Sequence, residues 1–157
     1  MFMGRRAIVI LLGTGCALCA CPGEPAPPTV FPADYRETYV EVRDCRRSGD
    51  HDLNYIRILA DPDATGPYMT RAEPFPVGSV ILKEEFDFAD GECAGDISQW
   101  TVMVRLPTGS SPATLDWTWY QVSADGDILG EDAPRCYGCH ATCEPDGVGY
   151  LGTCAEP

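Results

Sequence analysis

The chain has 157 residues, with 24 Asp and Glu against 11 Lys and Arg. This length allows one domain with a substantial core. A net charge of -13 repels phosphate backbones and anionic lipid, which argues against nucleic-acid binding and against a polybasic membrane contact. Nine cysteines indicate an oxidising compartment or a cofactor.

The N-terminus resembles the leader of an exported bacterial lipoprotein, with a signal peptide over residues 1–20. A basic pair at residues 5–6 precedes an apolar segment that is too short to span a bilayer. Residues 18–21, Leu-Cys-Ala-Cys, resemble a lipobox in which Cys21 receives the lipid. An ordinary signal peptide cut close to this point, or a second lipobox ending at Cys16, is the alternative.

The residues after the leader predict where the protein is held. Pro22 follows Cys21, where an aspartate would indicate retention in the inner membrane. We therefore expect an outer-membrane lipoprotein whose domain lies in the periplasm or at the cell surface. Residues 21–30 are rich in proline and predict an extended tether. Residues 31–157 contain no internal repeat and are expected to form a single domain.

The hydrophobic pattern of this domain predicts an α+β fold, a mainly antiparallel β-sheet with flanking helices. A first helix is expected over residues 33–44, since Tyr35, Tyr39 and Val42 fall on one helical face. A second short helix is expected over residues 61–71, and a third near the C-terminus after the last strand. Strands are expected at residues 55–60, 79–88, 99–106, 115–123 and 127–130.

Residues 136–140, Cys-Tyr-Gly-Cys-His, form the attachment pattern of haem c. Residues three and four apart lie on the same side of a helix. The thiols of Cys136 and Cys139 can therefore reach the two vinyl groups of one haem edge, while the imidazole of His140 binds the iron. Thioether bonds are made outside the cytoplasm, which agrees with the leader. We predict one covalent haem c per chain.

Zinc and plain disulfides are the alternatives for this segment. Cys143 extends it to Cys-x-x-Cys-His-x-x-Cys, but a structural zinc normally takes its ligands from two separated knuckles. Plain disulfides leave His140 without a role. The four other cysteines of the mature chain predict two disulfides, for which the sequence leaves three pairings open. The pairing we prefer is Cys45 with Cys154 and Cys93 with Cys143.

Four sequence blocks in order resemble the cytochrome P-460 family, which includes the nitric-oxide-binding cytochromes c′-beta. The blocks are residues 55–58 (Tyr-Ile-Arg-Ile), 76–84 (Pro-Val-Gly-Ser-Val-Ile-Leu-Lys-Glu), 116–119 (Asp-Trp-Thr-Trp) and 136–140. The resemblance covers most of the mature chain. It implies a mainly antiparallel sheet, a homodimer, and a five-coordinate haem with His140 as its proximal ligand.

Lys83 and Arg57 are the candidate catalytic residues that the resemblance implies. In enzymes of the family, the lysine that matches Lys83 is cross-linked to the haem. Lys83 is the only lysine of the chain, and a neutral amine can act as a nucleophile where a guanidinium cannot. An ordinary strand lysine beside Glu84 and Glu85 is the alternative. Arg57 matches an arginine that resembles a distal-pocket residue, and a surface or propionate partner is its alternative.

One departure from the family bears on the reaction. Family enzymes that oxidise hydroxylamine carry a carboxylate on the strand that matches residues 101–105, and this strand contains no acid. Either Glu84, Glu85 or another acid takes its place, or the cavity is apolar and suits a neutral diatomic such as nitric oxide. His51 is expected to be a solvated loop histidine.

The leading function is therefore an exported c-type haem protein whose open iron oxidises or binds small nitrogen species, hydroxylamine or nitric oxide. A nitric-oxide-binding module without turnover is the second reading. A low-spin electron-transfer cytochrome is the third, and it needs a sixth ligand. His51, Met69 and Met103 are the candidates for that ligand, although Met103 lies between two strand valines and is expected in the core.

Overall fold

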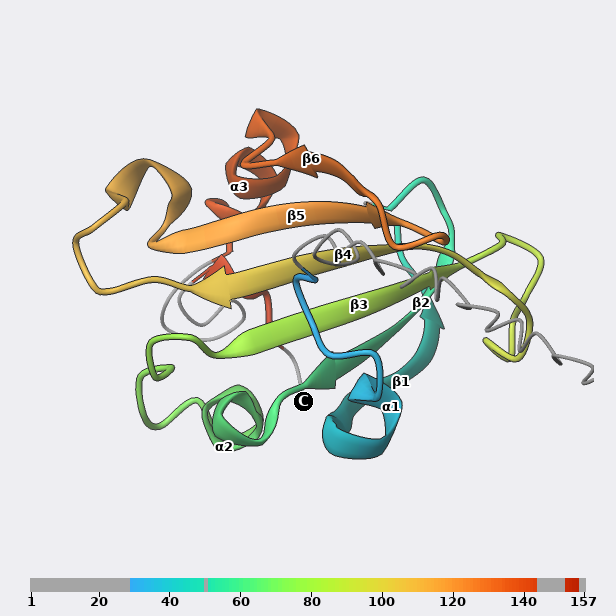
Figure 1. The fold of residues 1–157 in the computed structure, drawn as a ribbon, viewed down its shortest axis with the longest axis horizontal. Coiled ribbons are helices and arrows are strands. Elements are labelled where there is room, and N and C mark those ends of the chain that lie inside the picture. The colour runs from blue at the N-terminus through green and yellow to red at the C-terminus, as the bar shows by residue number, and fades with distance from the viewer. Residues whose placement is uncertain (1–28, 50, 144–151, 156–157) are drawn as a thin grey trace, which may run out of the picture.

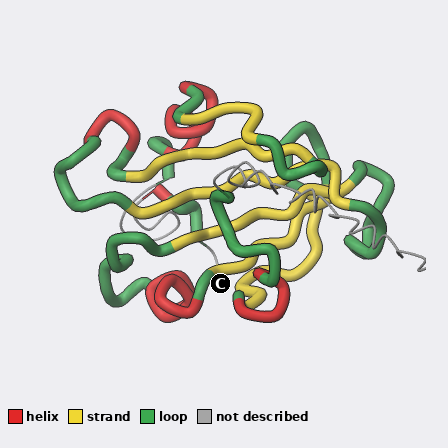
Figure 2. The backbone as a smooth tube through the Cα atoms, in the orientation of Figure 1, coloured by secondary structure: helices red, strands yellow, loops and turns green. Residues whose placement is uncertain are grey.

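The computed structural model describes residues 29–49, 51–143 and 152–155, and it has the predicted α+β architecture (Figure 1). Six antiparallel strands pair in chain order to form one sheet. The strands are β1 (Val40–Arg47), β2 (Tyr55–Ala60), β3 (Val80–Phe86), β4 (Ile97–Arg105), β5 (Trp117–Ser123) and β6 (Ile128–Glu131). The helices are α1 (Tyr35–Thr38), α2 (Pro62–Thr70) and α3 (Pro134–His140), with a 3-10 turn, η1, at Pro112–Thr114. The helices lie around the margin of the sheet (Figure 2).

The predicted helix over residues 33–44 is wrong, because α1 is a single turn and β1 begins at Val40. Tyr35 and Val42 are both buried, as an amphipathic helix requires, but they belong to two separate hydrophobic clusters. Val40 and Val42 instead alternate with polar residues along β1, which suits their β-branched side chains, and Val40 pairs with Ala60 of β2.

The two faces of the sheet carry different clusters, because successive side chains of a strand point to opposite faces. One face buries Leu59, Leu82, Val102 and Val122 beneath Tyr35. The blue N-terminal segment lies in front of this sheet in Figure 1, and the red residues near the C-terminus lie behind it. The second face carries the cluster that contains Ile58, Ile81, Met103 and Trp119. We call this second face the cavity face.

Asp61 fixes α2 beside the cavity face. Its carboxylate accepts a hydrogen bond from the backbone N–H of Ala64 at 2.6 Å, as an N-cap residue does. The same carboxylate accepts a second bond from the N–H of Val80, also at 2.6 Å. One side chain therefore begins the helix and ties it to β3, which positions the buried Tyr68 against the cavity.

Glu84 is fully buried on the other face, where three donors satisfy it. Tyr35 donates through Oη at 2.6 Å, Arg36 through Nε at 2.7 Å, and Arg57 through its guanidinium at 2.7 Å. Burial raises the pKa of Glu84, but these hydrogen bonds outweigh it, so the pKa lies below the usual value. Glu84 is thus an ionised structural anchor between α1 and the sheet.

The leader and most of the tether, including Cys21, lie outside the described residues. Within the part of the chain that the structure describes, no helix has the length and apolar character needed to cross a bilayer.

Candidate functional site

A cavity of about 480 Å³ lies on the cavity face, and β1, the loop after it, α2 and α3 contribute to its lining. The strand register builds its floor from rows of directly paired residues. Ile58, Lys83 and Thr101 form one row, and Ile81, Met103 and Trp119 form the next. Paired residues of an antiparallel sheet present their side chains on the same face. The cavity therefore has a polar end and an apolar end.

The predicted attachment residues all line this cavity from α3. Pro134 stands at the first turn of the helix, where its fixed φ suits helix initiation. Cys136 and Cys139 are free thiols, in contrast to the other four cysteines of the described residues. Burial raises the pKa of the Cys136 thiol, which keeps it protonated at neutral pH. Two reduced thiols are thus presented to the cavity.

The ring of His140 is held by contacts with Trp119, with the backbone at Gly152 and with Sγ of Cys154, which lies 3.8 Å from Nδ1. It packs against the ring of Trp119, with 4.6 Å between the centroids. Its Nδ1 lies 2.5 Å from the backbone carbonyl oxygen of Gly152. A carbonyl only accepts hydrogen bonds, so Nδ1 carries the proton and the lone pair belongs to Nε2. Histidines that bind metals are oriented in this way by an acceptor on the other ring nitrogen.

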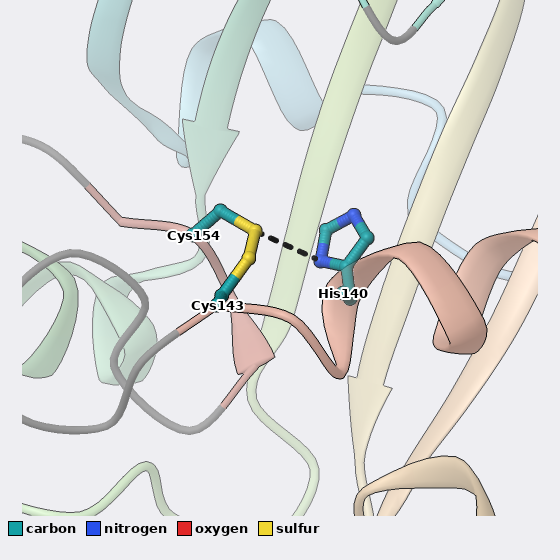
Figure 3. Close-up of side chains that lie close together, drawn as sticks. All are labelled: His140, Cys143 and Cys154. Carbon is teal, nitrogen blue, oxygen red and sulfur yellow. Dashed lines mark hydrogen bonds between the residues drawn. A yellow bond between two sulfur atoms is a disulfide. The ribbon is translucent and has the colours of Figure 1, made fainter.

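The disulfide pairing differs from the one we preferred, since Cys45 bonds to Cys93 and Cys143 to Cys154. The sequence could not distinguish the pairings because they depend on which loops the sheet brings together. The Cys143–Cys154 bond joins the end of α3 to the segment that carries Gly152, beside His140 (Figure 3).

The same disulfide argues against the zinc alternative. His140, Cys143 and Cys154 have potential ligand atoms within 4.8 Å of one another. However, the thiolate form of cysteine is the metal ligand, and a disulfide removes it. The Cys-x-x-Cys-His-x-x-Cys segment therefore lacks its fourth ligand.

Lys83 lies at the polar end of the cavity, in a chain of three ionisable groups. Its Nζ lies 2.7 Å from Nε2 of His51, and Nδ1 of the same ring lies 2.9 Å from Oε1 of Glu85. Glu85 also accepts hydrogen bonds from Gln99 at 2.7 Å and from Thr101 at 3.1 Å. Its pKa is lowered, because the hydrogen bonds from His51 and Gln99 outweigh the effect of burial, which raises it.

His51 is therefore not the solvated loop histidine that we expected. Its loop folds over the sheet, so its ring reaches Lys83 and Glu85 and lines the cavity. No motif marks His51, and only the fold reveals its place.

The family described as Cytochrome P460 matches residues 32–148. This chain belongs to the cytochrome P460 family. Membership shows that the protein is a haem-binding cytochrome. None of the curated proteins matches the chain significantly.

Arg57 does not lie in the cavity of this cytochrome P460. It stands on the opposite face, where its guanidinium binds Glu84 at 2.7 Å and packs over the ring of Phe86. Its neighbours Ile56 and Ile58 line the cavity instead, because side chains alternate along β2. A distal role for Arg57 therefore does not match this placement.

The two methionines named as axial candidates differ in position. Met69 is exposed on α2 and is not among the residues that line the cavity. Met103 lines the cavity but is packed in the core with Ile81 and Trp119. The expectation that Met103 is a core residue is confirmed.

The residues of the cavity fit a haem. The apolar end offers the side chains of Ile81, Met103 and Trp119, and α3 supplies two free thiols and an imidazole oriented for a metal. Haem also carries two carboxylates, for which guanidinium groups are strong partners. Four arginines contribute to the lining, and these are Arg43, Arg46, Arg47 and Arg135.

Proposed function

We propose that this cytochrome P460 is an exported haem c protein that oxidises small nitrogen species, with hydroxylamine as the model substrate. Cys136 and Cys139 would hold the haem by thioether bonds, and His140 would bind its iron through Nε2. Haem supplies one-electron redox chemistry and an iron that coordinates small nitrogen ligands. One observation carries the proposal. The same cavity is lined by Cys136, Cys139 and His140 and by the ionisable side chains of Lys83, His51 and Glu85.

The polar end of the cavity favours oxidation over binding alone. Oxidation of an N–H or O–H substrate releases protons, and a positioned base accepts them. Glu85 supplies the carboxylate that β4 lacks, since it lies beside β4 and accepts a hydrogen bond from Thr101. The hydrogen bonds that lower the pKa of Glu85 keep it ionised at neutral pH, so that it can stabilise the ring of His51 when that ring takes up a proton. Glu84 faces the other side of the sheet and does not contribute.

Nitric oxide binding without turnover is the second candidate. The apolar row of Ile81, Met103 and Trp119 supports it, because a neutral diatomic needs no charged partner. Electron transfer by a six-coordinate haem has less support, since both ring nitrogens of His51 already face Lys83 and Glu85.

An optical titration tests the proposed function. We expect high-spin bands for the ferric and ferrous protein, because His140 is the only residue that we propose would bind the iron. Nitric oxide should bind the ferrous protein, and hydroxylamine should be consumed when a one-electron acceptor is added. Sharp α and β bands in the ferrous protein without added ligand would indicate two axial ligands and would refute the open site.

Export and a lipid anchor at Cys21 belong to the same proposal. The two disulfides of the domain support it, since such bonds persist in oxidising compartments. We expect Cys21→Ser to release the protein in soluble form, whereas the wild type remains with the membrane. A mature wild-type chain whose intact mass includes no acyl groups would contradict the anchor.

The homodimer that the resemblance implies stays a prediction, and light scattering of the holoprotein tests it.

A further inference from the structure

Three ionisable side chains stand in series across the polar end of the cavity. Lys83 lies on β3, His51 lies on the loop after β1, and Glu85 lies two residues beyond Lys83 on the same face of β3. The two contacts in the series are 2.7 Å and 2.9 Å, both within hydrogen-bonding distance. The imidazole thus bridges the amine of Lys83 and the carboxylate of Glu85.

The atoms define how this series can carry a proton. An ammonium on Lys83 has only donors, so it donates to Nε2 of His51. Nδ1 then carries the ring proton and donates to Oε1 of Glu85. Thr101 and Gln99 hold both oxygens of that carboxylate, which orients it toward the ring. In hydrolase triads a carboxylate in this position orients the imidazole and stabilises its protonated form without taking a proton itself.

We propose that Lys83, His51 and Glu85 form a proton relay that links the cavity to solvent and takes the place of the missing acid on β4. This inference rests on the proposed oxidation. In one transfer, the N–H bond at Lys83 Nζ breaks as a new one forms at Nε2 of His51. The ring is then an imidazolium whose Nδ1–H stays hydrogen-bonded to Glu85, and its Nε2–H bond breaks as an O–H bond forms on a solvent water. One proton thus leaves the amine and one reaches water, with no change in the number of electrons.

Burial sets the direction of the relay. The Glu85 side chain is 1% exposed, whereas that of His51 is 22% exposed. Protons therefore pass to solvent from the ring of His51 and not from Glu85. Returned to its neutral form, Lys83 has a lone pair that accepts the next proton released in the cavity.

Other charged groups surround the relay and set its electrostatic background. The charged ones that share the cavity lining are Arg43, Arg46, Arg47, Asp52 and Arg135. The neutral titratable ones are Tyr68, Tyr120, Cys136, Cys139 and His140. Asp52 is the nearest of these in sequence to His51, but it points to Arg135, with 2.9 Å between the charged atoms. It therefore provides a control that changes charge near the relay without breaking it.

Lys83 makes a direct test feasible, because a chain with one lysine gives one side-chain amine signal after ¹⁵N-lysine labelling. We would titrate the ferrous carbon monoxide complex of the holoprotein, which is diamagnetic, and follow Nζ of Lys83 together with the ring of His51. We expect the Nζ resonance to shift in step with the titration of the His51 ring. This shared step should disappear in His51→Gln and persist in Asp52→Asn. The control substitution is tolerated by the backbone, because asparagine readily adopts the positive φ of 54° found at this position.

Kinetics gives the second measurement. General acid–base catalysis contributes roughly 100-fold or more, so His51→Gln should lower kcat for hydroxylamine by about 100-fold and leave KM and haem content unchanged. Glu85→Gln keeps the shape of the side chain and should remove the same limb of the pH profile. Identical Nζ titration curves in the wild type and His51→Gln would overturn the relay. A shared titration step without hydroxylamine oxidation would instead keep the relay and refute the proposed substrate.

Discussion

Replacing Cys136 and Cys139 together with serine should abolish covalent haem attachment. The two thiols are free, lie on one short helix and line the cavity, and no other free cysteine occurs within the described residues. A serine hydroxyl cannot form the thioether. After denaturing electrophoresis, peroxidase staining of the double variant should show no haem, whereas each single variant should keep haem through one bond.

The matched control for this experiment removes two other cysteines. Cys45→Ser with Cys93→Ser breaks a disulfide whose residues do not line the cavity. This change should lower the free energy of unfolding by about 2–5 kcal/mol but leave covalent haem in place. Haem that stays on the denatured Cys136→Ser, Cys139→Ser chain would contradict the attachment site.

Lys83→Arg should abolish hydroxylamine oxidation, with a loss of at least about 100-fold in kcat, while nitric oxide binding stays intact. Arginine keeps the positive charge but has no accessible neutral form, so it can neither accept a proton nor act as a nucleophile. The family resemblance also predicts a bond between Lys83 and the haem. Forming it replaces one N–H and one C–H bond and releases two protons and two electrons, so it needs an oxidant of the peroxide class.

The optical spectrum separates these two roles of Lys83. If the cross-link forms, the spectrum of Lys83→Arg should change to that of ordinary high-spin haem c. If the wild type and the variant share one spectrum and one haem-peptide mass, there is no cross-link. If hydroxylamine oxidation is also unchanged, the nitric-oxide-binding function takes precedence over the enzyme.

Strands β2 to β6 could be predicted from sequence because their patterns are local. Alternating apolar residues place Val102 and Val104 on one face of β4 and Met103 on the other, as the structure has them. The prediction of the first helix was wrong because its local pattern is ambiguous. The spacing of Tyr35 and Val42 fits one face of a helix, but it fits a helical turn followed by a strand equally well. Only the burial of the two residues in separate clusters distinguishes these cases.

The site could be predicted only where a motif is contiguous. Cys136, Cys139 and His140 follow one another on a helix, so their spacing alone gives their common side. The choice between Glu84 and Glu85 depends on strand register, because one step along β3 moves a side chain to the other face. The place of His51 depends on how its loop folds over β3, which no local pattern records.

A tryptic map of the wild-type protein tests the central claim most directly. The chain has no lysine or arginine after Arg135, so residues 136–157 form one peptide. After reduction and alkylation, we predict that this peptide carries the mass of one haem and alkyl groups only on Cys143 and Cys154. If the cross-link is present, the peptide of residues 72–105 remains attached, uncut at Lys83. Four alkylated cysteines in residues 136–157, with no added haem mass, would contradict the account.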